Sequence, residues 1–134
     1  MKRSVLDSCA LLAHLLGEPR GRVVRKLLEQ AREGDRLLFC CWVNITEVHY
    51  AISRRLGQHR AAEILRILEE LPISFLPAGR DICLRAAEIK RQHTIALGDA
   101  FAAATALVLE AEVVTGDPEF RQLEGVVSVR WLAT

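Results

Sequence analysis

The sequence predicts an α/β fold with a mainly parallel sheet of five strands. Short apolar runs alternate with longer stretches of helical period along the chain of 134 residues, and this alternation is typical of parallel strands joined by helices. The composition is 51% hydrophobic, which provides enough apolar material for one continuous core in a chain of this length. We therefore expect a single domain over residues 1–134.

Five short apolar runs are expected to form the strands. They cover residues 3–7, 36–43, 71–78, 111–117 and 125–132. In the third run, Pro72 and Pro77 lie on either side of Ile-Ser-Phe-Leu. Proline cannot donate a hydrogen bond to a neighbouring strand, so this run is expected to be a short strand near the edge of the sheet.

Six stretches between these runs have helical period, and several of them end on glycine, as helices commonly do. They cover residues 8–17, 20–34, 45–57, 59–71, 80–93 and 99–111. In the second stretch the apolar residues Val24, Leu27 and Leu28 lie on one stripe, with Arg25 and Glu29 opposite. This pattern predicts an amphipathic helix that packs on the sheet.

Four carboxylates occupy predicted junctions between elements. Asp7 follows the first strand, Asp117 follows the fourth, Glu47 lies in the first turn of one helix and Asp99 opens another. Each fits a structural role by itself, because aspartate is a favoured N-cap and the spacing from Asn44 to Glu47 has the form of a capping box.

The junctions also have a functional interpretation. In an open parallel sheet the carboxyl ends of the strands meet at one edge, where such folds bind ligands. Asp7, Glu47 and Asp117 are therefore expected to share that edge, whereas the position of Asp99 depends on the tertiary path.

Converging carboxylates need a cation. Two like charges about 4 Å apart cost about 4 kcal/mol at an effective dielectric constant of 20, and a helix N-terminus offsets only about 0.3–1 kcal/mol. Oxygen ligands with few histidines nearby favour Mg²⁺ or Mn²⁺ over zinc.

The residues around these acids carry a family resemblance. The segments VLDSCALLAHL, NITEVHYAI, LGDAFAAATAL and VVTGDPEF, in this order, resemble the four acidic motifs of PIN-domain proteins, and more narrowly the VapC-type ribonuclease toxins of type II toxin–antitoxin pairs. The resemblance implies a Rossmann-like three-layer α/β/α sandwich and a metal-dependent endoribonuclease. It also implies a homodimer and an antitoxin that masks the site.

The resemblance further assigns residues by motif. Thr115 matches a hydroxyl two residues before the last aspartate, and Ser8 matches a small polar residue after the first. The acids expected to be catalytic and to bind Mg²⁺ or Mn²⁺ are Asp7, Glu47, Asp99 and Asp117. Glu119 is expected to be a solvated acid of a first helical turn rather than an outer ligand. Hydrolysis would leave a 5′-phosphate and a 3′-hydroxyl.

RNA must approach this acidic site through basic groups around it. The formal net charge of +1 provides no overall attraction for a polyanion, so local patches or bound metal must do so. The candidate residues are Arg20, Arg22, Arg25, Lys26, Arg54, Arg55, Lys90, Arg91 and His93.

Three other functions remain open at this point. A magnesium-dependent phosphatase with Asp7 as nucleophile usually has a second aspartate two residues on, where this chain has Cys9. A phospho-acceptor receiver typically uses a lysine on a late strand, and the chain has no lysine after Lys90. The last alternative is a catalytically inert PIN-like domain that only binds a partner.

The sequence also bears on the compartment in which the protein works and on its self-association. No apolar run reaches the roughly 20 residues that cross a bilayer, and the cysteines form no CxxC pair. We therefore expect a cytoplasmic protein with reduced thiols and no membrane association. Residues expected either in a homodimer interface or in the core are Ile64, Leu65, Ile67, Leu68 and Leu71.

Overall fold

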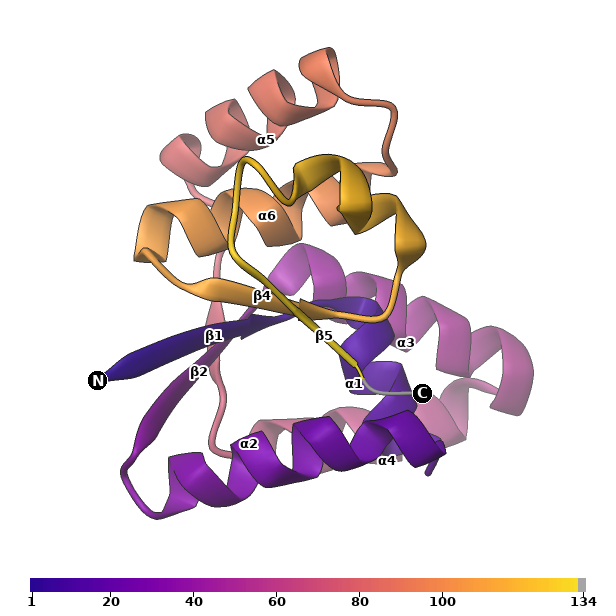
Figure 1. Cartoon of the computed structure of the whole chain (residues 1–134). Coiled ribbons are helices and arrows are strands. Elements are labelled where there is room, and N and C mark those ends of the chain that lie inside the picture. The colour runs from indigo at the N-terminus through magenta and orange to yellow at the C-terminus, as the bar shows by residue number, and fades with distance from the viewer. Residues whose placement is uncertain (133–134) are drawn as a thin grey trace.

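The computed structural model describes residues 1–132 (Figure 1). Its strands and helices alternate in the order expected for parallel strands with crossover helices. The elements are β1 (Lys2–Leu6), α1 (Ser8–Leu15), η1 (Pro19–Gly21), α2 (Arg22–Arg32), β2 (Arg36–Cys41), α3 (Trp42–Leu56), α4 (Gln58–Glu70), β3 (Ser74–Leu76), α5 (Arg80–Gln92), α6 (Leu97–Leu109), β4 (Glu112–Thr115), η2 (Pro118–Leu123) and β5 (Val129–Trp131), where η denotes a 3₁₀ helix.

The strands form one sheet in the order β3-β2-β1-β4-β5, and every neighbouring pair is parallel. The central strand is β1, where Val5 aligns with Phe39 of β2 and Val113 of β4. The short strand β3 lies at the edge, as the flanking prolines predict. The expected five-stranded parallel sheet is confirmed.

Helices cover both faces of this sheet, which confirms the three-layer architecture. Leu6 and Val114 face the core formed with α1, α2, α3 and α4. Their neighbours Val5 and Val113 face the opposite core, formed with α5, α6 and η2. Successive side chains of a strand point to opposite faces, so each inner strand contributes to both cores. Figure 1 shows α5 and α6 on one side of the sheet and α2 and α4 on the other.

A polar network ties the amino ends of the strands together. Glu112 Oε2 accepts hydrogen bonds from Ser4 Oγ at 2.6 Å, from Arg130 Nε at 2.8 Å and from Arg36 Nη1 at 3.2 Å. Burial opposes ionisation of Glu112, but the hydrogen bonds from Arg130 and Ser4 outweigh it and hold the Glu112 pKa below its ordinary value. The network accounts for the buried side chains of Ser4 and Arg36, because buried charges need partners.

The start of α3 differs from the sequence prediction. The strand expected over residues 36–43 ends at Cys41, and α3 begins directly at Trp42 with no side-chain cap. Asn44 and Glu47 therefore lie inside the helix, so the capping-box interpretation and the first-turn position of Glu47 are wrong. Without a capping residue, the sequence contains no marker for this boundary.

Within residues 1–132 no helix combines the length and the apolar content that a membrane span requires.

Candidate functional site

Asp7 lies where β1 passes into α1. Its Oδ1 accepts the Ala10 backbone N–H at 2.8 Å, so the residue is the N-cap of α1. The side chain is almost completely buried, and Oδ2 has no hydrogen-bond partner among the described residues. One carboxylate oxygen therefore caps the helix while the other is left for a different partner.

Asp117 follows the end of β4, the strand next to β1. Its backbone N–H donates to Thr115 Oγ1 at 3.0 Å, and its Oδ1 accepts the Glu119 backbone N–H at 3.0 Å, which caps η2. Thr115 is fully buried. Its hydroxyl therefore fixes the backbone turn that carries Asp117.

Asp99 reaches the same edge from the other direction. Helix α6 precedes β4 in the chain and runs back along the sheet, so its first turn lies where the strands end. Asp99 is 8% exposed, and carboxylate oxygens of Asp99, Asp117 and Glu119 lie within 4.8 Å of one another. The helix begins two residues earlier than expected, at Leu97. Glu119 is exposed in the first turn of η2, as expected for a solvated acid, and one of its carboxylate oxygens also lies in this cluster.

Glu47 is held against the start of α6 by Asn44. Asn44 Nδ2 donates to Glu47 Oε1 at 3.0 Å and to the Gly98 carbonyl oxygen at 3.1 Å. A side chain at position 98 would collide with the Glu47 carboxylate. Gly98 thus permits α3 and α6 to approach closely enough for Glu47 to lie near Asp99. Gly98 and Asn44 were not predicted as site residues, although a glycine directly before Asp99 can indicate a close approach.

Burial and neighbouring negative charges raise the pKa values of Asp7 and Asp99. Burial raises the pKa of Asp7 to about 7 against the opposing effects of the nearby Thr115 hydroxyl and the Ala10 amide, and the charges of Asp117 and Glu47 add to the increase. Burial, followed by the Asp117 charge, also raises the pKa of Asp99. The structure therefore brings Asp7, Glu47, Asp99 and Asp117 into one electrostatic cluster.

The donor set fits a hard divalent cation. Buried polar atoms in proteins nearly always have hydrogen-bond partners, yet Asp7 Oδ2, Asp99 Oδ2 and Asn44 Oδ1 have none among the described residues. All are acceptor oxygens, which are the ligands that Mg²⁺ and Mn²⁺ prefer. The remaining unpartnered buried atom, His14 Nδ1, belongs to the side of α1 that packs near α2 rather than to the acids.

Ser8, predicted as a supporting residue, begins α1 directly after Asp7. It lines a cleft between α1 and α3 that lies beside the acids. The structure thus places Ser8 at the margin of the cluster rather than within it.

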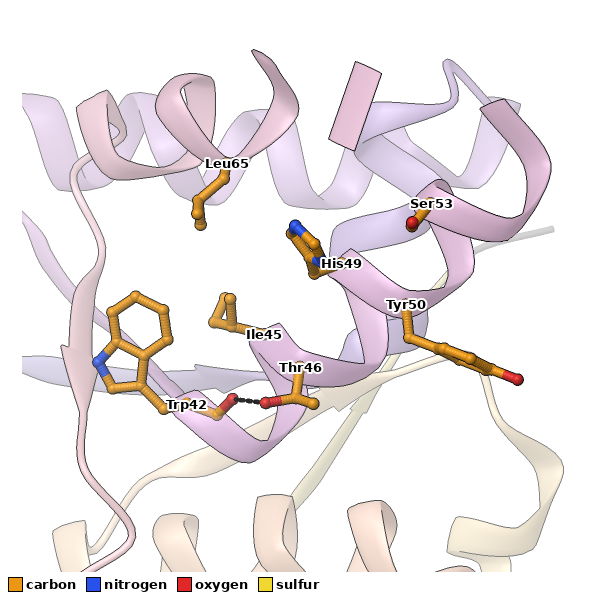
Figure 2. Close-up of a pocket in the computed structure, with 7 residues that line it drawn as sticks. All are labelled: Trp42, Ile45, Thr46, His49, Tyr50, Ser53 and Leu65. Carbon is orange, nitrogen blue, oxygen red and sulfur yellow. Dashed lines mark hydrogen bonds between the residues drawn. The ribbon is translucent and has the colours of Figure 1, made fainter. Parts of the chain in front are cut away.

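A separate apolar hollow of about 340 Å³ lies between α3 and α4. Trp42, Ile45 and Leu65 are among its lining residues, and none of the four acids contributes to it (Figure 2). Of the residues weighed for a dimer interface, Ile64 and Leu68 are in the core, while Ile67 is exposed, and Leu65 and Leu71 are partly buried against the core.

Solved structures of toxin–antitoxin proteins have the same fold. VapBC2 from Rickettsia felis, bound to a promoter DNA fragment, superposes with a TM-score of 0.80 at 13% identity, over 98% of this chain and 99% of that chain. DNA-bound VapBC from Salmonella typhimurium superposes with a TM-score of 0.77 at 14% identity, over 99% and 100%. VapC20 from Mycobacterium tuberculosis, a toxin that cleaves the sarcin–ricin loop, has a TM-score of 0.68 at 16% identity, over 89% and 93%.

Comparison of the sequence with protein families identifies the family of this chain more directly than the likeness of the folds does. No curated protein sequence matches the chain. The PIN domain family, however, matches residues 4–126, which include the four acidic segments, the strands β2, β3 and β4, and most of β1. The resemblance seen in the sequence is confirmed, and the chain belongs to the PIN-domain family.

Proposed function

We propose that the chain is the toxin of a toxin–antitoxin pair and hydrolyses RNA phosphodiesters as a Mg²⁺- or Mn²⁺-dependent endoribonuclease. Membership of the PIN family and the likeness to VapC folds support the class. One observation supports the chemistry most strongly: Asp7 and Asp99 each have a buried carboxylate oxygen without a hydrogen-bond partner among the described residues, and the charge of Asp117 acts on both residues.

The acids of the cluster would have different roles according to their positions. Asp7 and Asp117 would hold the metal ion through the oxygens that helix capping leaves free, and Asp99, which caps no helix, would hold it through its carboxylate. Glu47 and Glu119 would complete the negative cluster. A bound Mg²⁺ or Mn²⁺ would polarise the phosphoryl oxygen and lower the pKa of the attacking water. The protein's task is then to position the groups and to neutralise charge.

The neighbouring polar groups keep these carboxylates oriented. Thr115 holds the Asp117 backbone, and Asn44 binds Glu47 Oε1, which leaves Glu47 Oε2 to accept a proton from the attacking water. The hydrogen bonds that support a metal ligand commonly affect metal affinity or activity by about 10- to 100-fold. Thr115 and Asn44 are therefore positioning residues.

The test is cleavage of a mixed pool of tRNA, rRNA and single-stranded RNA by the protein free of antitoxin. Cleavage with Mg²⁺ or Mn²⁺, loss with EDTA, and products with 5′-phosphate and 3′-hydroxyl ends are expected. Metal-independent cleavage would overturn the mechanism. Binding of a protein partner without any cleavage across the pool would indicate the inert alternative.

Replacing Gly98 with alanine should reduce cleavage without unfolding the protein. The new methyl group would collide with the Glu47 carboxylate and displace it, and small misplacements of catalytic groups cost up to about 100-fold in rate. The clash falls on the end of a flexible side chain, and alanine favours a helix, so the melting temperature should not fall. Steady-state cleavage and thermal melts of Gly98→Ala measure the two effects.

The matched control is Gly79→Ala, because Gly79 also lies at a helix start but a Cβ there meets only open space. It should leave cleavage unchanged. Equal losses in the two variants would show that Gly98 does not act through Glu47.

The same proposal includes assembly and location. We expect a cytoplasmic homodimer that a cognate antitoxin binds and inhibits. Exposed apolar side chains such as Trp42, Leu56 and Ile67 support self-association, since large exposed apolar groups often mark interfaces. Sedimentation velocity over a range of concentrations should show a dimer, and a monomer at every concentration would contradict it.

A further inference from the structure

A second hollow lies beside the acids, between α1 and α3. This cleft has a volume of about 580 Å³. Its lining includes three arginines, Arg20, Arg54 and Arg55, together with Tyr50 and a single acid, Glu18. We call it the arginine cleft. Residues from η1 and from α3, far apart in the sequence, thus supply its positive charge.

The arginine cleft lies next to the acidic cluster, although none of the four acids lines it. Ser8, which lines the cleft, directly follows Asp7, and the Arg20 guanidinium lies against Gly116, the neighbour of Asp117. On α3, Tyr50 and Arg54 follow Glu47 by three and seven residues, which places all of them on one helix face. Arg54 is then about 10 Å along the helix axis from Glu47. An RNA strand that leaves the acidic cluster along this helix face would pass Tyr50 and then Arg54.

Hydrogen bonds within the cleft hold the side chains of Arg54 and Arg20 in place. Arg54 Nη1 donates to the Tyr50 hydroxyl at 2.8 Å, and its guanidinium carbon lies 5.6 Å from the centre of the tyrosine ring. Arg20 Nε donates to Glu18 Oε1 at 2.9 Å. Tyr50 is 60% exposed and lines both the arginine cleft and the hollow between α3 and α4, and Figure 2 shows its ring extending away from Trp42 and Leu65. An exposed ring held by an arginine can stack on a base.

We propose that the arginine cleft binds the single-stranded RNA segment next to the phosphate that is cleaved. Arg20, Arg54 and Arg55 contact backbone phosphates, and Tyr50 stacks on one base. This assignment rests on the proposed nuclease function and adds the path of its substrate. Positive side chains that follow a strand and an aromatic ring for its bases are the two features that single-stranded nucleic acid binding combines.

Three of the other six basic residues predicted from the sequence make local hydrogen bonds or ion pairs. Lys90 Nζ donates to the Ile95 carbonyl at 2.8 Å, and Arg91 pairs with Glu88. Arg22 Nε donates to the Pro19 carbonyl at 3.3 Å. These residues lie outside the cleft. The structure favours Arg20, Arg54 and Arg55 because these three line the cleft and none of the other six candidates does.

Binding can be measured apart from cleavage. A short fluorescein-labelled single-stranded RNA of random sequence is titrated with protein in which Asp99→Asn removes cleavage, and anisotropy reports the affinity. Adding Tyr50→Leu should weaken binding on the order of tenfold, the usual effect of losing one stacked base. Adding Arg54→Gln should weaken binding and reduce the slope of log affinity against log salt by about 0.7, the value for one phosphate contact to a single strand.

Arg85→Gln is the matched control, because Arg85 is an exposed arginine of α5 outside the cleft. It should change neither affinity nor salt slope. The same variants in the wild-type background should lower cleavage of the RNA pool in proportion to their loss of affinity.

The outcomes separate the two proposals. RNA binding that depends on the cleft, without metal-dependent cleavage by the wild-type protein, would support the arginine cleft and overturn the nuclease. Cleavage by the wild type with unchanged affinity in Tyr50→Leu and Arg54→Gln would overturn the arginine cleft and keep the nuclease. That second result would instead point to an acidic protein segment as the occupant. Absence of both binding and cleavage would overturn both.

Discussion

Asp99→Asn should reduce metal-dependent RNA cleavage by about 100-fold or more. The substitution keeps the shape of the side chain but removes a buried negative charge whose Oδ2 has no partner among the described residues. Losing one preorganised electrostatic contact at a reacting centre commonly costs about 10²–10³ in rate. Initial rates of cleavage at saturating Mg²⁺ measure the effect.

The control for this change is Asp81→Asn. Asp81 also lies in the first turn of a helix, but it is exposed on α5 and outside the acidic cluster. Its substitution should leave the rate unchanged. If Asp99→Asn retained most of the activity while Asp81→Asn behaved like the wild type, the assignment of Asp99 to the metal site would be wrong.

The metal-free protein should lose stability as the pH rises from about 4 to 7. The pKa of Asp7 is raised from 3.8 to about 7 in the folded protein, so in this window the native state holds a proton that the unfolded state has released. The free energy of unfolding then falls by about 1.4 kcal/mol per pH unit for this group. The contribution is complete below the unfolded pKa and is lost as the pH passes the folded pKa.

Urea denaturation in EDTA at pH 5 and pH 8 measures this slope against Asp7→Asn. Asparagine is as good an N-cap as aspartate, so the variant should keep α1 and become more stable than the wild type at pH 8, by at most about 4 kcal/mol. Asp35→Asn, at an exposed position, should follow the wild type. Parallel pH profiles for Asp7→Asn and the wild type would show that the Asp7 proton is not linked to folding.

The fold could be predicted because its pattern is local. Apolar runs alternate with helical periods, and Pro72 and Pro77 indicate the edge strand that became β3. Asp7 and Asp117 could be placed together for the same reason, since each directly follows a strand of one parallel sheet. Both act as N-caps as well, so their structural and proposed functional roles coincide.

The rest of the site depends on contacts between segments distant in the sequence. Asp99 reaches the edge because α6 runs back along the sheet, and Glu119 joins it through the turn at Pro118. The contacts of Asn44 with Gly98 across two helices follow no spacing rule. Likewise, no periodicity brings Arg20 of η1 beside Tyr50 of α3.

Calorimetric titration of the protein with Mn²⁺ at pH 7, without RNA, shows directly whether the acids form a divalent metal site. Repeating it in two buffers of different ionisation enthalpy gives the protons released. Saturable binding with proton release is expected, because metal ligands must ionise before they bind and Asp7 has a pKa of about 7. Both signals should disappear in Asp99→Asn. Equal binding by wild type and Asp99→Asn, or no binding by the folded wild type, would show that these acids do not form a divalent metal site.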